Sequence, residues 1–298
     1  HISIIKMVDG EVSTEEKAKI ASRLILLAPP CQFNEVFTDV RFLVDDDKLL
    51  QEKVSGSFAR YNKEQFIQVK VGDSEQHCLI TQHGDLGSGR FHCPRTHQSF
   101  RFDHLKREAS DVQQHKPSSS AAAAALEPWR VAVEKAVTEY VAEHYRGGPA
   151  CSIYAAADAE KQIIVCIESH YSRHSTSGRW RSEWFVSLPD KLQSGTANCK
   201  GTIKVQTHIY DNGNVQLISS KENNISLKVD GNADQFAKQF VNSMKEADED
   251  YQNAIGEKFK NLSSSTFKSL RRPLPITGEK IQWDKIMTYK VGQDIANA

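Results

Sequence analysis

The stretch that decides the fold is TIKVQTHIYDNGNVQLISS, residues 202–220. Its two halves, 202–210 and 215–220, have the mixed apolar and polar composition of strands. Between them, the Asn-Gly pair at 212–213 tolerates the positive φ that a tight turn requires. The stretch therefore predicts two antiparallel strands joined by a short turn.

Three more strand-like runs precede this hairpin, and no helix-like segment separates them. They lie at 151–156, 161–169 and 179–188. Consecutive strands of this kind favour an antiparallel meander over a parallel sheet. With a helix that begins near Pro128, they form a predicted helix-plus-sheet region at 127–222.

A long helix is expected after the sheet, at 233–272. Phe236, Phe240, Met244 and Tyr251 recur along it as an apolar stripe. A helix of this length and pattern is expected to cover one face of the sheet.

The segment GRWRSEW, at 178–184, places two tryptophans on the same side of a strand. Trp180 and Trp184 are four residues apart and face the same way, whereas Arg181 and Glu183 face the opposite way. We expect one face to bury the indoles against the long helix and the other to carry an ion pair.

The N-terminal region, 13–65, is predicted to contain three short helices. Ser13 and Glu16 have the spacing of a capping box, and Ile20, Leu24 and Leu27 continue that helix. The second and third helices are predicted from apolar residues at 33–44 and at 50–61. Short connections predict that the three stack as an antiparallel bundle.

Residues 66–110 change to short strand-like runs, which predict small hairpins. The runs are 66–71, 77–81, 90–92 and 99–103. A Ser- and Ala-rich insert at 111–126 follows and is interpreted as a surface loop, although its alanines are also able to extend the next helix backwards.

Composition excludes several classes of protein. The 298 residues include 38 Lys+Arg and 38 Asp+Glu, so bulk charge does not favour a nucleic-acid partner. No apolar run approaches the roughly 20 residues of a membrane span. The six cysteines form no CxxC pair, which favours reduced thiols and a cytoplasmic location.

Two segments suggest ligand sites, but each is explained more simply by turns and strands. Residues 78–97 hold two cysteines and three histidines, yet they lack the paired spacing of zinc ribbons and fingers. The glycines of GDLGSGR, 84–90, lack the Lys-Ser/Thr and the helix that follow a phosphate loop. We therefore expect no metal and no cofactor.

Glu168, Ser169, His170 and Ser182 include the residue types of a hydrolase active site. However, the sequence has no nucleophile elbow, and nothing in it orders base and nucleophile. The residues carry no catalytic constellation, so we expect no enzyme.

The C-terminal segment, 273–298, carries the strongest functional signal. Pro273 and Pro275 stop the preceding helix, and Trp283, Ile286 and Met287 then share one side of an amphipathic segment that also carries lysines. Two interpretations stay open: a terminal helix docked on its own domain, or a mobile arm for a groove on an acidic partner. The prolines favour the arm.

The sequence resembles the F-actin capping protein alpha subunit family along most of its length. The resemblance is carried by GRWRSEW at 178–184, FKSLRRPLP at 267–275, APPCQFNEVFTDVR at 28–41, ITQHGDLGSGRF at 80–91 and the ending IQWDKIMTYKVG. It implies an α+β fold with an N-terminal three-helix stalk, a small hairpin region, a five-stranded antiparallel sheet covered by a long helix, and a mobile C-terminal amphipathic tail.

The resemblance also implies a function and partners. Members of the family form an obligate heterodimer with a beta subunit. The heterodimer binds the barbed end of the actin filament in the cytoskeleton and blocks subunit gain and loss there, and this capping needs no calcium. Lys268, Arg271, Arg272, Trp283, Ile286 and Tyr289 match the positions that bind actin. Of these, Lys268 and Arg272 match the surface that meets phosphoinositides, and capping-protein regulators are further implied partners.

Two departures from the family pattern stand out. Gly278 replaces a basic residue that faces actin in the family, and Glu279 adds a charge of opposite sign, which together predict a weaker cap. Cys31 replaces a usual glycine. The departure at 278–279 motivates an alternative: a scaffold subunit of a larger actin- or motor-adaptor complex.

Overall fold

The computed structural model describes residues 12–72, 74–75, 77–115, 121–156, 161–209 and 215–261. The chain divides into two compact units between Met244 and Lys245. The first unit contains every element up to the first turns of the last helix. The second contains the rest of that helix, to Asn261.

The N-terminal helices form as the sequence predicts. Helix α1 spans Thr14–Leu26 and opens with the capping box of Ser13 and Glu16. Helix α2 spans Phe33–Val44. The third segment is continuous but irregular: α3 at Asp47–Leu49, a π-helical turn at Leu50–Val54 and α4 at Ser55–Glu64.

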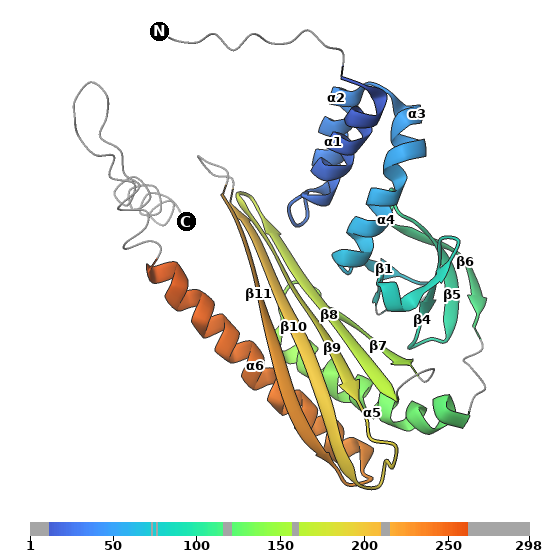
Figure 1. Ribbon diagram of the computed structural model, residues 1–298, viewed down its shortest axis with the longest axis vertical. Coiled ribbons are helices and arrows are strands. Elements are labelled where there is room, and N and C mark those ends of the chain that lie inside the picture. The colour runs from blue at the N-terminus through green and yellow to red at the C-terminus, as the bar shows by residue number, and fades with distance from the viewer. Residues whose placement is uncertain are drawn as a thin grey trace. The chain divides into compact units, whose positions relative to one another are not determined.

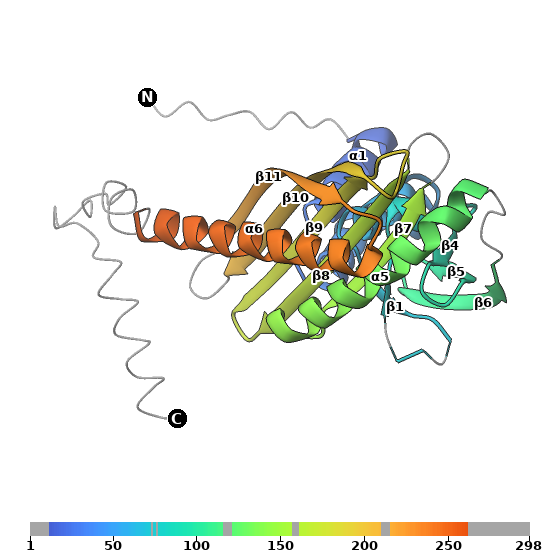
Figure 2. The ribbon, with the colours of Figure 1, turned by 90° about the horizontal axis from the view of Figure 1, so that it is seen from below.

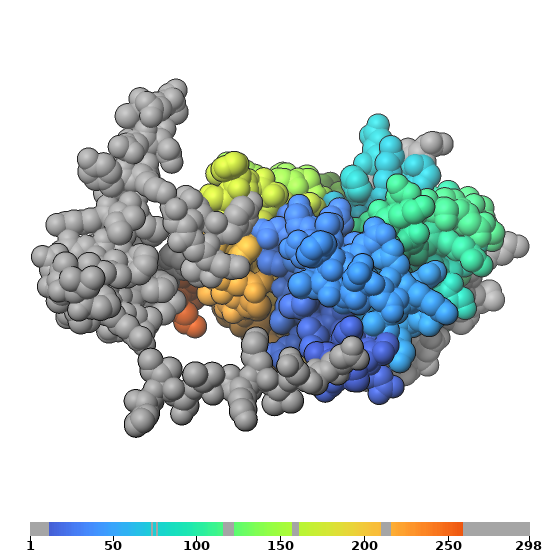
Figure 3. Space-filling model, turned by 90° about the horizontal axis from the view of Figure 1, so that it is seen from above, coloured from blue at the N-terminus to red at the C-terminus, as the bar shows by residue number. Residues whose placement is uncertain are grey.

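The interior of this helical region is aromatic. Phe33 packs edge-on against Phe58, with 5.9 Å between ring centroids. On α1, Ala21 and Ile25 are buried, whereas Ile20 and Leu27, the residue that follows the helix, are about half exposed. The surface of these helices is the blue region of Figure 3.

Two small antiparallel sheets follow. Strands β1 (Gln68–Lys70) and β2 (His77–Leu79) form one pair. The second sheet is formed by β3 (Asp85–Gly87), β4 (Arg90–Cys93), β5 (Gln98–Asp103) and β6 (Glu108–Gln114), in that order. The sequence did not predict β3 or β6. Most of β6 is exposed and polar, so it lacks the alternation by which strands are recognised.

The alanines of the insert belong to a helix. Helix α5 spans Ala121–His144 and contains Pro128 within it. The structure thus decides the question that the sequence left open, since residues 121–126 extend the helix backwards and are not a loop.

The main sheet is the predicted five-stranded meander. Its strands are β7 (Ala150–Ala156), β8 (Gln162–Arg173), β9 (Thr176–Ser187), β10 (Gly195–Ile209) and β11 (Val215–Val229). They lie in the order β11-β10-β9-β8-β7, and every pair is antiparallel (Figure 1). Ile209 pairs with Val215 at the predicted hairpin.

One face of the sheet is covered by α5 and by the first turns of α6 (Ala233–Asn261) (Figure 2). Trp184 of β9 is fully buried and lies edge-on to Phe240, at 5.9 Å. Beside it, a Cβ at Gly201 of β10 would stand 2.2 Å from the Trp184 ring, so only glycine leaves room for the indole. The predicted packing of Trp184 on the long helix is confirmed.

Candidate functional site

The predicted actin-binding residues lie outside the described part of the chain. Lys268, Arg271, Arg272, Trp283, Ile286 and Tyr289 all follow Asn261, as do Gly278 and Glu279. Their roles stay predictions, as does the helical continuation over 262–272. The described residues contribute three features: the edge strand β11, a buried polar junction and a basic pocket.

Strand β11 is a long edge strand. It has 15 residues and pairs with β10 on one side, and no described strand pairs with its other side. From Gln216 to Lys228 its side chains alternate between exposed and half-buried, and Ile218 is 63% exposed. A row of backbone donors and acceptors along such an edge is a template for another strand.

A buried ion pair lies on the sheet face opposite α5 and α6. Glu168 of β8 and Arg179 of β9 are buried, with Arg179 Nε 2.8 Å from Glu168 Oε1. Arg179 Nη1 also donates to Gln65 Oε1, at the end of α4, over 3.1 Å. The Glu168 carboxylate further accepts from Gln68 Nε2, at 2.7 Å, and lies 3.0 Å from His170 Nδ1. This network joins the helical region to the sheet through buried, hydrogen-bonded charges.

The same contacts argue against the hydrolase arrangement. Glu168 serves Arg179, and the Ser169 hydroxyl donates to the Arg146 carbonyl over 2.9 Å. Ser182 lies on β9 between Trp180 and Trp184, whose side of the strand is opposite to that of Arg181. The four residues therefore do not converge on one reactive point.

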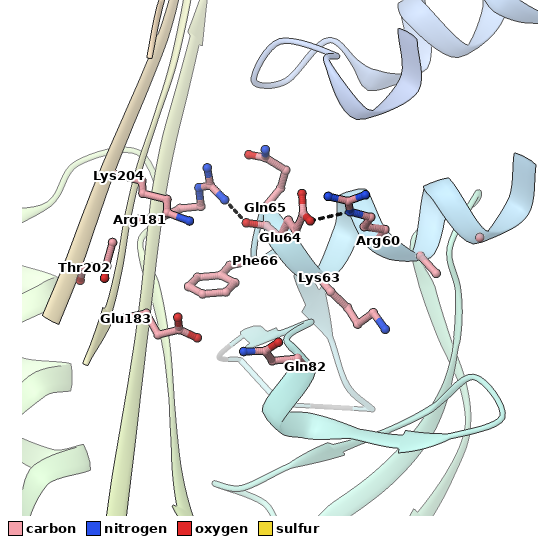
Figure 4. Close-up of a pocket in the computed structure, with 13 residues that line it drawn as sticks. Arg60, Lys63, Glu64, Gln65, Phe66, Gln82, Arg181, Glu183, Thr202 and Lys204 are labelled. Atoms are coloured by element: carbon pink, nitrogen blue, oxygen red, sulfur yellow. Dashed lines mark hydrogen bonds and ion pairs between the residues drawn. The ribbon is translucent and has the colours of Figure 1, made fainter. Parts of the chain in front are cut away.

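A pocket of about 610 Å³ opens between α4 and strands β9 and β10 (Figure 4). Its lining includes four cations and two acids: Arg60, Lys63, Arg181, Lys204, Glu64 and Glu183. Arg60 pairs with Glu64, and the Arg181 guanidinium donates to the Glu64 carbonyl. Burial, together with the nearby charge of Arg179, lowers the pKa of Arg181 to about 10. Arg60 and Lys63 both have acidic partners, since Lys63 also pairs with Asp85 over 3.0 Å.

The far side of the GRWRSEW strand differs in detail from its prediction. Glu183 Oε1 lies 2.8 Å from His83 Nε2, on the turn at Gln82–Gly84, and Arg181 bonds to the backbone of α4. The expected ion pair of Arg181 with Glu183 is thus replaced by a hydrogen bond between Glu183 and His83, a residue about 100 positions away that the sequence pattern does not connect to it.

The 78–97 segment is held by strands and turns, as expected. Cys78 and Cys93 are buried free thiols on β2 and β4. The Cys78 thiol donates to Cys93 and lowers the pKa of the Cys93 thiol to about 6, and contacts from Thr96 act in the same direction. All six cysteines are free thiols.

Comparison with known proteins gives a consistent result. The family model described as F-actin capping protein alpha subunit matches residues 21–294. An F-actin-capping protein subunit alpha of Caenorhabditis elegans is 40% identical over 96% of this chain and 99% of its own length. That of Dictyostelium discoideum is 30% identical over 95% and 99%.

A solved structure shares the fold. The homodimeric actin capping protein alpha subunit from Plasmodium berghei superimposes with a TM-score of 0.73 at 21% identity, covering 89% of this chain and 99% of that one. None of the helices in the described ranges has the length and apolar character needed to cross a lipid bilayer. The α+β fold predicted from the sequence is confirmed, and the match over nearly the whole length shows that this chain belongs to the F-actin capping protein alpha subunit family.

Proposed function

We propose that this chain is the alpha half of a heterodimeric cap that binds the barbed end of the actin filament, independently of calcium, and blocks subunit addition and loss there. The single observation that carries the proposal is the family match along residues 21–294, which supports actin capping. The alternative of a scaffold subunit with weakened capping is not favoured, since the relatives are named as capping subunits. The chain acts in the cytoplasm, at the cytoskeleton, and binds rather than catalyses.

The beta subunit docks along β11 in this proposal. The 15-residue edge offers backbone groups along one side, and a partner strand placed there extends the five-stranded sheet into a continuous one. The half-exposed apolar residues Ile20 of α1 and Leu27, which follows that helix, offer further surface for the partner's helices.

The tail grips actin in this proposal. Lys268, Arg271 and Arg272 provide cations for the acidic filament surface, and Trp283, Ile286 and Tyr289 provide apolar contacts. Two arms, one from each subunit, raise the effective concentration of the second contact and slow dissociation. Lys268 and Arg272 also bind phosphoinositides, which compete with actin for the same charges.

Seeded elongation of actin from barbed ends tests the cap. The chain is co-expressed with a beta subunit and compared with a version that ends at Arg272. We expect the full complex to stop growth and the truncated complex to lose most of its affinity. Growth that continues at saturating full complex contradicts capping. Equal capping by both versions contradicts the proposed role of the tail, and would mean that the arm of the beta subunit provides the contact with actin.

Hydrogen exchange at β11 tests the partner. Every second amide of an edge strand points away from its neighbour, so those amides exchange fast in the chain alone and slowly once a partner strand is paired. Native mass of the complex identifies that partner. A complex made of two copies of this chain, in the manner of the homodimeric alpha subunit from Plasmodium berghei, contradicts the heterodimer.

A further inference from the structure

Three side chains of the types that ligate metals lie close together beside the pocket, which Glu183 lines. The ligand atoms of His83, Cys166 and Glu183 all lie within 4.8 Å of one another. They come from three separate elements: His83 from the turn at Gln82–Gly84, Cys166 from β8 and Glu183 from β9. This is the only such cluster of three among the residues that the structure describes.

The fold holds the three residues firmly in place. Cys166 and Glu183 are direct partners in the β8–β9 register, so their side chains leave the sheet side by side. The turn that carries His83 is closed by Thr81, whose hydroxyl accepts from the Gly84 amide at 3.3 Å. A Cβ at Gly84 would lie 3.0 Å from the Tyr154 hydroxyl, so glycine lets this turn approach the sheet closely.

The separations suit a tetrahedral divalent metal. Zinc bonds of about 2.0 Å to nitrogen and oxygen and about 2.3 Å to sulfur place donor atoms roughly 3.3–3.5 Å apart. Adjustments on the order of 1 Å bring the three donors to that spacing, and imidazole, thiolate and carboxylate are all ligands that zinc accepts.

The surroundings supply an access route and a fourth position. Cys166 is fully buried in an apolar cluster with Tyr154 and Ile164, whereas Glu183 and Gln82 line the open pocket. Figure 4 shows Glu183 directed from the sheet toward the turn of Gln82. A water molecule from the pocket is therefore able to complete the coordination.

We propose that His83, Cys166 and Glu183 form a binding site for a zinc-like divalent cation, with water as the fourth ligand. The Cys166 thiol loses its proton to solvent when the metal–sulfur bond forms, and no oxidation or reduction takes place. The thiolate and the carboxylate carry two negative charges, which balance the cation in a place where a net charge is costly. Bound metal ties the turn at 82–84 to the sheet.

Burial sets the pH dependence of this site. Desolvation raises the pKa of the Cys166 thiol well above its usual value, and the negative charge of Glu183 adds to that effect. The metal must displace the thiol proton, so we expect its affinity to rise with pH.

Cobalt(II) titration of the full chain, co-expressed with a beta subunit and stripped with a chelator, tests the site. Cobalt reports its ligands by colour: we expect a near-ultraviolet thiolate-to-cobalt band and the intense visible bands of tetrahedral coordination, saturating at one metal per chain. Zinc is expected to displace the cobalt, and to raise the melting temperature by a few degrees because it binds only the folded state.

Matched variants assign the ligands. Cys166→Ala should abolish the thiolate band, whereas Cys199→Ala should keep it, since Cys199 is an equally buried thiol on β10. His83→Gln and Glu183→Gln retain hydrogen-bonding side chains and should each weaken binding at least tenfold. These variants keep the test decisive if Cys166→Ala fails to fold.

Two results contradict the proposal. One is the absence of any saturable cobalt band in the wild-type complex up to millimolar metal, which leaves His83 and Glu183 as a hydrogen-bonded pair. The other is a thiolate band that survives Cys166→Ala, or affinity unchanged in both glutamine variants, which places the metal elsewhere. Neither result bears on capping, which is measured separately.

Discussion

Strands β7 and β11 are the two edges of one sheet, and the chain treats them in opposite ways. Beside β7, the guanidinium of Arg130 on α5 donates to the Ile153 carbonyl, and the Leu79 amide of β2 donates to the Ser152 hydroxyl. The first five residues of β7 are buried. Along β11 only Val229 is buried among the side chains described.

The contrast between β7 and β11 predicts that one edge of the sheet contributes to the stability of this chain and the other to its association with a partner. The β7–β9 half completes its own core, so changes there should alter the free energy of unfolding. No strand in the described ranges pairs with the outer side of β11, and changes there should act on whatever pairs with it. Single substitutions in the purified complex test that division.

The largest effect is expected from Glu168→Ala. Removing this carboxylate leaves Arg179 charged, buried and without its main partner, which should lower the free energy of unfolding by about 3–5 kcal/mol. Urea denaturation measures the change. Glu222→Ala on β11 is the matched control: its side chain is exposed, and a change within about 0.5 kcal/mol is expected. Equal effects of the two would remove the contrast.

Gly201→Ala should rank second. The added methyl group meets the ring of Trp184, and the strain should cost about 1–3 kcal/mol. The control is Gly56→Ala on α4, where nothing lies within 4 Å and the helix should gain about 0.5–1 kcal/mol. Thermal melting reports both, and a neutral Gly201→Ala would mean that the indole is free to move aside.

Cys31→Gly should raise stability by about 1 kcal/mol. Cys31 has φ 63°, a left-handed conformation that is costly for residues other than glycine, and the greater freedom of glycine in the unfolded chain offsets part of the gain. Cys31→Ala retains the Cβ and should bring no such gain. A lower melting temperature for Cys31→Gly would show instead that the thiol contact with the Tyr171 carbonyl, at 3.7 Å, matters more.

Ile218→Lys should change the unfolding free energy least, within about 0.5 kcal/mol, because the side chain is 63% exposed. If the partner covers this surface, the same change should speed dissociation of the complex. The dissociation rate is measured by binding this chain to surface-immobilised partner subunit. Ser220→Lys, which changes another exposed residue of β11, is the comparison. Loss of stability without faster dissociation would place Ile218 in the chain's own core.

Much of the fold follows from local patterns. Alternation and the Asn-Gly turn predicted the meander, and the capping box at Ser13 and Glu16 predicted the start of α1. Strand β6 escaped prediction because its side chains are mostly polar and exposed. On α1, the apolar residues at 20, 24 and 27 marked a helix, yet Ala21 and Ile25 form its buried face. Where a helix carries two apolar faces, hydrophobicity alone does not predict which face is buried within the same chain.

The sites were predicted less completely. GRWRSEW identified the strand, and Trp184 packs as expected, but no spacing rule joins Glu183 to His83 and Cys166. Such a cluster depends on strand register and on one tight turn, which are long-range properties of the fold. The predicted actin-binding residues lie beyond Asn261, so the described structure leaves them as predictions from the sequence.

The meander order has a consequence for how the protein is made. Each strand from β8 to β11 pairs with the strand synthesised just before it, so the sheet is able to grow hairpin by hairpin as the chain leaves the ribosome. The last strand to be added is β11, whose outer edge has no partner among the strands that the structure describes. An unpaired edge of this length is a template for aggregation, and a partner strand of the kind proposed above would protect the chain by covering it.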